Sequence, residues 1–248
     1  MTTSSPLTRV LGLVSLAALV TLAVMALWVS PADVNQQDAV RLLYIHVPAA
    51  FVMYVAFGIT TLASTLWLWP RTRARRWDLL AGASAEVGIV FLALVLVVGS
   101  IWGRTTWGVW WTWDARLTST AVLFVLYLGY LALRRVPADT EVRARRAAIA
   151  AVAIAVDIPI VHKSVEWWRT LHQKSSLLDE ETFLHPHIHG VMWWTVMVGM
   201  AAFTVLFVWL LVHRYRLAVL VDRVEDRSLE QAIAERRAEA GELAGVGG

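Results

Sequence analysis

The chain has 248 residues, of which 58% are hydrophobic and 17% are charged, and its mean hydropathy is +0.59. These values exclude an ordinary soluble globular protein and indicate an integral membrane protein. The chain contains no cysteine, which excludes disulfides, thiol chemistry and thiolate-held metal centres within it.

Six apolar runs are each close to the roughly 20 residues that a helix needs to cross a bilayer. They fall at 10–29, 43–69, 79–101, 117–133, 147–161 and 191–212, and the fifth is short. No long stretch alternates polar and apolar residues with period two, which argues against a β-barrel. The first run is longer than a signal-peptide core and lacks a clear cleavage site, so it is expected to be retained. The sequence therefore predicts an all-α membrane protein with a bundle of six transmembrane helices.

Basic residues gather in alternate loops. The loops after the second and fourth runs carry Arg71, Arg73, Arg75, Arg76, Arg134, Arg135, Arg143, Arg145 and Arg146. The positive-inside rule makes these loops and both termini cytoplasmic and places 30–42, 102–117 and 162–190 outside. The net charge of +3 follows from this topology, so no nucleic-acid partner is expected. We expect a transmembrane domain at 1–213 and a charged cytoplasmic tail at 214–248, either a solvated helix or partly disordered.

The first outside segment leads into His46, which stands alone just inside an apolar helix. Its surroundings read Tyr44-Ile-His-Val-Pro-Ala-Ala50, with Pro48 in the first turn, where proline is tolerated. A lone histidine at a membrane surface is more often a hydrogen-bonded structural residue than a ligand. His46 is therefore a candidate ligand only in combination with other residues outside.

The second outside segment is unusually rich in tryptophan, and its tryptophan-rich part runs over 102–118. Five indoles gather there, and the part from 107 to 118 also carries one carboxylate and one guanidinium: Trp102, Trp107, Trp110, Trp111, Trp113, Asp114 and Arg116. Flat aromatic faces beside these charges suit a large, flat, partly charged ligand, whose polar rim the indole N–H groups and Arg116 reach. An interfacial aromatic belt is the alternative. A belt accounts for one or two tryptophans per helix end, so the density favours a ligand platform.

The third outside segment adds His162 and His172 together with Trp167 and Trp168. Neutral imidazole is a common axial ligand of haem iron, and haem is a large, flat, aromatic dianion. Two histidines that flank the tryptophan platform therefore indicate a haem site. Chlorophyll or a quinone also suits such a platform, but neither accounts as directly for two histidines and an arginine at one surface.

Three motifs resemble those of the CcmC family of haem-handling proteins, which belongs to the type I cytochrome c maturation system. They read Ile-His-Val-Pro-Ala-Ala, Trp-Gly-x-Trp-Trp-x-Trp-Asp-x-Arg-Leu-Thr and Ser-Val-Glu-Trp-Trp-x-Thr-Leu-His-Gln, and the likeness runs over about 31–173. The second motif is similar to the WWD domain of the wider haem-handling superfamily. The resemblance implies that His46 and His172 are axial ligands of the iron of haem b. It also implies a platform along the haem edge, formed by Trp107, Trp110, Trp111, Trp113 and Asp114.

The resemblance further implies a location and partners. Members of the family lie in the bacterial inner membrane, hold haem at the periplasmic face and present it to the membrane-anchored haem chaperone CcmE. They work beside the ABC transporter subunits CcmA and CcmB and the small membrane protein CcmD. We therefore expect haem binding and transfer without conventional catalytic turnover, with Arg116 or Arg104 paired with a haem propionate.

Other functions and other histidines remain as alternatives. A haem-bearing quinone or redox enzyme would place histidine pairs deep in facing helices, whereas these candidates cluster on one side. A haem permease subunit would need polar groups along its spans, and few are present. We expect His162 to be a capping or interfacial residue and prefer His172 as the ligand. Three histidines are expected to be solvated, although their spacing allows adventitious metal binding: His185, His187 and His189.

Overall fold

The computed structural model describes residues 5–172 and 188–246, and within these ranges all regular structure is helical. In chain order the elements are α1 (Pro6–Val24), the π-helical turn η1 (Met25–Val29), the 3-10 turn η2 (Asp38–Leu42), α2 (Leu43–Leu68), α3 (Arg75–Trp107), α4 (Ala115–Arg135), α5 (Thr140–Ile154), α6 (Asp157–Trp167) and α8 (Gly190–Val246). Among the described residues, six helical stretches are long and apolar enough to cross a membrane, and α5 with α6 forms one of them. The prediction of an all-α membrane protein with six spans is confirmed.

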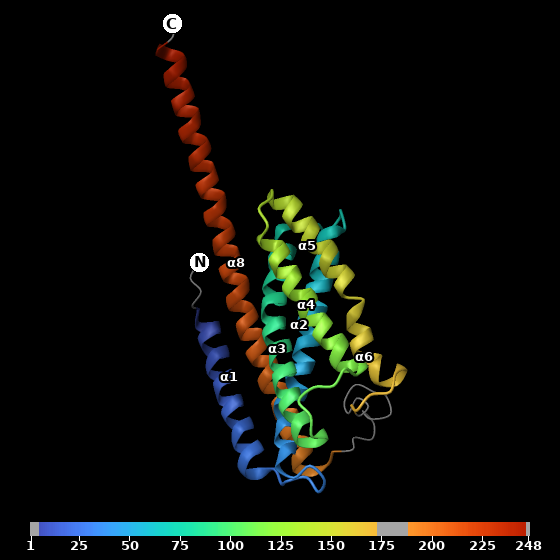
Figure 1. The fold of residues 1–248 in the computed structure, drawn as a ribbon. Helices are drawn as coiled ribbons and strands as arrows, with labels where there is room; N and C mark the ends of the chain where they lie inside the picture. Colours follow the sequence, from blue (N-terminus) through green and yellow to red (C-terminus); the bar gives the residue numbers. More distant parts are fainter. Residues whose placement is uncertain (1–4, 173–187, 247–248) are drawn as a thin grey trace.

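The two ends of the bundle carry different connections (Figure 1). One end carries the α2–α3 and α4–α5 connections, and the N-terminus of α1 and the extended part of α8 point toward it. We call it the arginine end. The opposite end, which we call the site end, carries the segment 30–42, the connection 108–114 and residues 168–172 after α6. The described parts of the three segments expected to lie together outside therefore share one end of the molecule.

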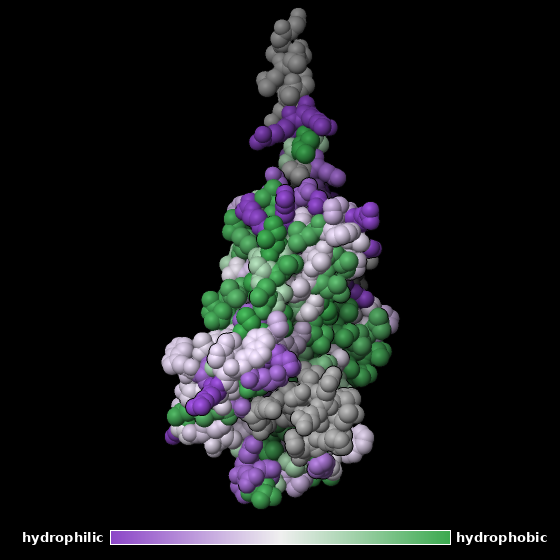
Figure 2. Space-filling view, turned by 90° about the vertical axis from the view of Figure 1, so that its right-hand side faces the viewer, coloured by the Kyte–Doolittle hydropathy of each residue, from purple (hydrophilic) through white to green (hydrophobic). Residues whose placement is uncertain are grey.

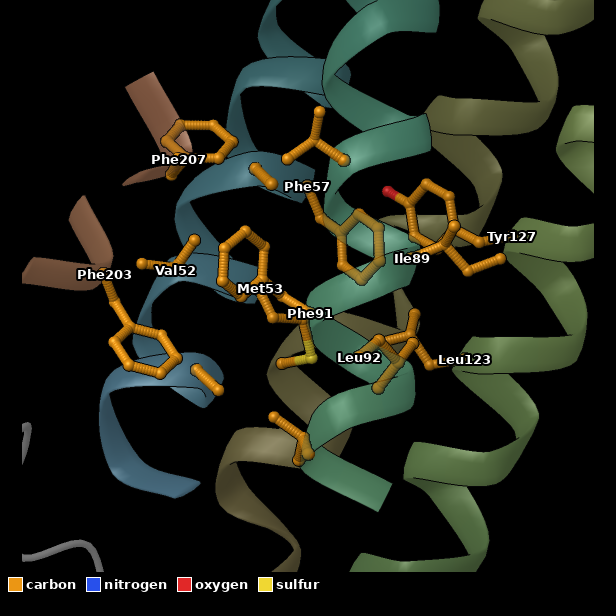
Figure 3. Packing of buried hydrophobic residues seen from close by; sticks show 14 of the residues in the cluster. Val52, Met53, Phe57, Ile89, Phe91, Leu92, Leu123, Tyr127, Phe203 and Phe207 are labelled. Carbon is orange, nitrogen blue, oxygen red and sulfur yellow. The ribbon is translucent and has the colours of Figure 1, made fainter. Parts of the chain in front are cut away.

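The core is built around α2 and α3, which pack on each other more extensively than any other pair of helices. At Gly88 of α3 an added Cβ would lie 2.7 Å from the ring of Phe57, so glycine is what allows this close approach. The Phe57 ring stacks on Tyr127 of α4 with centroids 3.6 Å apart. On the other side, Phe203 and Phe207 of α8 contact Phe91 (Figure 3). This aromatic layer joins four helices and fixes their spacing in the middle of the bundle.

Helix α3 is longer than its apolar run and continues through Trp107. Gly103 lies within this helix and does not end it. The ring of Trp107 packs over Gly103, where an added Cβ would lie only 3.2 Å from the ring. The helix ends at Gly108, whose φ of 78° is the left-handed conformation that favours glycine at a C-cap. The tryptophan segment is thus helical at both ends, and only 108–114 forms a connection.

The fifth span is broken in the middle, as α5 ends at Ile154 and α6 begins at Asp157. Pro159 lies in the first turn of α6, where its missing N–H has no intrahelical partner to lose. Helix α5 packs on α2 and α4, whereas α6 packs chiefly on α4. The break therefore lets α6 follow a course of its own at the site end.

The arginine end is held by ion pairs that reach the extended part of α8. Asp78, with 3% of its side chain exposed, pairs with Arg134 at 2.6 Å and with Arg75 at 2.7 Å. Arg75 also pairs with Asp222 of α8. Because α8 runs unbroken past residue 213, the tail expected at 214–248 begins inside this helix.

Apolar side chains cover the middle of the bundle on the face shown in Figure 2, and hydrophilic ones gather toward the arginine end. The helix α1 presents most of its length outward, with large exposed apolar residues such as Leu13 and Leu16. A hydrocarbon environment stabilises such a surface, whereas water does not. The surface thus agrees with the composition in indicating a multi-pass membrane protein.

Candidate functional site

The site end contains a cavity of about 280 Å3 between α2, α3, α4 and α6. Its wall is mostly apolar, with side chains such as Leu43, Phe51 and Leu96. The groups on it that can bind or orient a ligand are His46, Trp102, Trp107, Arg116, His162 and His172. Both histidines expected to be ligands thus reach one cavity, although they come from different outside segments.

His46 is placed by α2 and held in position by α3. A Cβ at Gly99 would lie 2.8 Å from Cε1 of His46, so the imidazole occupies space that only glycine leaves open. The Trp102 ring meets the imidazole edge-on, with centroids 5.7 Å apart. The indole N–H of Trp102 donates to Oε1 of Gln36 at 2.8 Å. Nδ1 of His46 is buried and has no hydrogen-bond partner at normal distance among the described residues. The backbone of Val95 in α3 is the polar group that acts on the ring, so packing orients it together with this weak contact.

His172 follows the end of α6 and is held by hydrogen bonds. Its Nδ1 lies 3.1 Å from Oδ2 of Asp114, and its backbone N–H donates to the hydroxyl of Thr170 at 3.0 Å. The Thr170 hydroxyl in turn donates to the same carboxylate oxygen at 2.9 Å. The Trp107 ring packs edge-on against the imidazole at 4.7 Å between centroids. A carboxylate only accepts, so the proton of a neutral His172 is on Nδ1 and its Nε2 carries a free lone pair.

The electrostatics of this pair support those protonation states. Burial lowers the pKa of His172 below its ordinary value, outweighing the charge and hydrogen bond of Asp114, which raise it. Burial raises the pKa of Asp114, but hydrogen bonds from Leu117 N–H and Thr170, with the neighbouring His172, bring the net value below the ordinary one. At neutral pH the pair is therefore a neutral imidazole beside a carboxylate.

Arg116 is the positive group of the cavity. It lies in the first turn of α4, where it donates to the carbonyl of His162 at 2.8 Å and to the hydroxyl of Ser164 at 3.4 Å. Both acceptors are uncharged, so neither of them neutralises the positive charge that Arg116 places on the cavity wall. Arg104, the other candidate for an anionic group, donates to the carbonyl of Gly108 and does not line the cavity.

The remaining tryptophans of the expected platform lie beside the cavity and do not line it. Trp110 is 59% exposed and Trp113 is 83% exposed. Trp111 meets Trp113 edge-on at 5.8 Å, and its buried Nε1 has no hydrogen-bond partner among the described residues. Of the four tryptophans expected along a ligand edge, only Trp107 faces the cavity. The others lie on residues 108–113, which we call the aromatic loop, and of these Trp110 and Trp113 face outward.

Several cavity residues were missed or placed differently by sequence reasoning. His162, expected at a cap or interface, lines the cavity and meets Tyr54 edge-on at 5.9 Å. Gly99, Gly103 and Thr106 also line it. They are spaced by four and three residues, so they share one face of a helix. The sequence would have predicted this face if the third helix had been expected to continue past residue 101.

The other histidines do not form a second cluster in the described ranges. His213 lies on the part of α8 toward the arginine end and meets Trp209 edge-on at 5.2 Å. His189 is exposed just before α8. His185 and His187 lie outside the described residues. Within the described part of the chain, paired histidines therefore occur only at the site end.

Comparisons with known proteins agree on one family. The sequence model of a family described as Heme exporter protein C (CcmC) matches residues 1–230. The Heme exporter protein C of Haemophilus influenzae is 39% identical over 192 residues, which are 77% of this chain and 76% of that protein. The protein of the same name from Bradyrhizobium diazoefficiens is 39% identical over 222 residues, or 86% and 79%. A ccmC-like mitochondrial protein of cytochrome c biosynthesis from Marchantia polymorpha is 37% identical over 161 residues, or 65% and 67%.

Proposed function

This chain belongs to the haem exporter protein C family, and from that premise we propose that it holds haem between His46 and His172 and delivers it to a haem chaperone. Membership implies a haem-handling role in cytochrome c maturation. The proposal adds which residues hold the haem, on which face of the membrane they hold it, and which protein receives it. The observation that supports it best is that two imidazoles from distant segments line the same cavity.

The residues of the cavity fit a haem. The iron of haem, held by four ring nitrogens, can take two more ligands, and two imidazoles would supply them. His172 has its Nδ1 bound to Asp114, so Nε2 remains for iron, while the buried Nδ1 of His46 lacks a hydrogen-bond partner at normal distance among the described residues. Apolar side chains and the rings of Trp102 and Trp107 suit the porphyrin, and Arg116 suits a propionate.

The chain's own groups would then perform binding, orientation and release. Haem supplies an iron centre and a reactive vinyl edge when it is bound. His46 and His172 would hold the iron, Arg116 would neutralise a carboxylate of the haem, and Trp107, which packs on His172, would lie near the porphyrin. We assign the exposed indoles of Trp110 and Trp113 to the recipient, which must approach this rim to take the cargo.

The cellular setting follows the same proposal. The arginine end faces the cytoplasm with both termini, and the site end faces the periplasm of a bacterial inner membrane. The recipient is the haem chaperone CcmE, and the ABC subunits CcmA and CcmB and the small protein CcmD complete the assembly. The cargo is haem b. The chain itself carries out no conventional turnover.

The ligand assignment is tested on purified protein loaded with haem. We expect the absorption spectrum of six-coordinate, bis-histidine iron in the unaltered protein. His46→Ala and His172→Ala should each weaken haem retention or change this spectrum, because each removes one iron ligand. His189→Ala, alone or with His185→Ala and His187→Ala, is the matched control and should change little. Loss of haem in the triple variant, with full retention in His172→Ala, would overturn the assignment.

A further inference from the structure

Asp114 lies beside the cavity but does not line it, and its carboxylate is fully engaged by the protein. Oδ1 accepts the backbone N–H of Leu117 at 2.8 Å, which caps α4. Oδ2 accepts the hydroxyl of Thr170 at 2.9 Å and lies 3.1 Å from Nδ1 of His172. The carboxylate therefore faces the back of an imidazole whose other side reaches the cavity.

This arrangement is one that metal-binding histidines commonly use. A carboxylate on the far nitrogen fixes the tautomer and the ring orientation, and it increases the electron donation of the near nitrogen to the metal. His46 has no carboxylate behind it: its Nδ1 lacks a hydrogen-bond partner at normal distance among the described residues, and the polar group that acts on the ring is the uncharged backbone of Val95. It is oriented by the packing of Gly99 and Trp102. The two imidazoles thus differ in what holds them and in how strongly each can donate.

We propose that Asp114 is a positioning residue that acts through His172: it holds Nδ1, turns Nε2 toward the cavity and makes His172 the stronger of two unequal iron ligands. This inference rests on the proposed haem site. Asp114 is then not part of the surface that touches the haem edge. It is the link between the start of α4, the residues after α6 and the iron.

The proposal predicts an effect on the redox balance of bound haem. An imidazole that donates more strongly favours ferric over ferrous iron, since it compensates the additional positive charge. Removing the carboxylate charge should therefore raise the midpoint potential. A tenfold loss in the preference for ferric iron corresponds to a rise of about 59 mV for one electron, and we expect a change of that order.

The test uses the full-length protein loaded with haem, and two variants that keep a helix cap. Asp114→Asn removes the charge and retains an acceptor, and Asp114→Ser retains capping ability at the start of α4. The midpoint potential is measured by spectroelectrochemical titration. The matched control is Asp38→Asn, which removes one carboxylate charge at the same end, from an exposed pair with Arg41. We expect both Asp114 variants to raise the potential and Asp38→Asn to leave it unchanged.

A second readout needs no haem. In apoprotein carrying 15N-labelled histidine, His172 should show the Nδ1–H tautomer, identified by the loss of its signals in His172→Gln. Asp114→Ser should shift this histidine toward the Nε2–H form or a mixture. An unchanged tautomer and an unchanged potential in a folded, haem-loaded variant would overturn the role of Asp114. Failure of the unaltered protein to bind haem through two histidines would instead overturn the proposed function.

Discussion

Single residues decide whether the two imidazoles reach the cavity. Each histidine depends on one neighbour that performs no haem chemistry itself: Gly99 leaves room for His46, and Asp114 holds His172. Both neighbours belong to segments distant in sequence from the histidine that they serve. The site is therefore sensitive to changes at positions that carry no ligand atom.

Gly99→Ala should displace His46 and lower haem occupancy. The new Cβ would lie 2.8 Å from Cε1 of His46, well inside van der Waals contact, so the ring or α3 must move. The ratio of haem to purified protein measures the effect. Gly58→Ala in α2 is the matched control, since its Cβ would meet nothing within 4 Å. This control should keep full occupancy and add up to about 1 kcal/mol of helix stability. Equal occupancy in both variants would contradict the role of Gly99.

The exposed indoles of the aromatic loop should matter for delivery more than for binding. Trp110→Ala with Trp113→Ala removes two side chains that do not line the cavity, so haem should remain bound. Covalent loading of the recipient chaperone should fall, because the rim that it approaches has lost its aromatic contacts. Trp107→Ala is the comparison and should reduce retention itself, since this ring packs on His172. If the double variant loads the chaperone normally, these indoles have no role in delivery and are an aromatic belt at the membrane interface.

At the scale of elements, the sequence predicted the six spans and the grouping of three outside segments, because both follow from long apolar runs and charge. It did not predict where α3 ends. Gly103 and Gly108 look alike in sequence, but Trp107 packs over the first, and only the second adopts a positive φ. Nor does a short run of indoles have a period that shows which of them face inward. The ligand roles of His46 and His172 stay predictions.

The ion pairs of Asp78 should be essential to the packing of α3 on α4. Asp78→Ala leaves the guanidinium of Arg134, 17% exposed, without its carboxylate partner. Removing one member of a buried ion pair costs about 3–5 kcal/mol, which should appear as a marked fall in the thermal midpoint in detergent. Glu141→Ala breaks the exposed pair with Arg73 and should cost about 0–1 kcal/mol. Similar losses in the two variants would show that burial does not strengthen the Asp78 contacts.

The whole molecule has a charge asymmetry, with arginines gathered in the connections at one end, and the positive-inside rule predicts its orientation in the membrane from it. Because it lacks cysteine, single cysteines can be introduced without background labelling. Cysteines at Val34 and Thr105 lie at the site end, and one at Thr140 lies at the arginine end, all on exposed side chains. An impermeant thiol reagent applied to spheroplasts should label the first two and not the third. Labelling of the third alone would invert the protein and favour a cytoplasmic haem or redox role.

Helix α8 is long enough to extend far beyond the bundle. Its 57 residues, at about 1.5 Å each, exceed twice the roughly 30 Å of a bilayer core. The pairs with Arg75 and Arg143 hold it at Asp222 and Glu225, where the bundle ends. From Asp222 to Val246 the helix reaches about a further 36 Å. A tilt of about 10° around this fulcrum would swing the far tip by about 6 Å, so small rotations among the membrane helices become large displacements in the water beyond them.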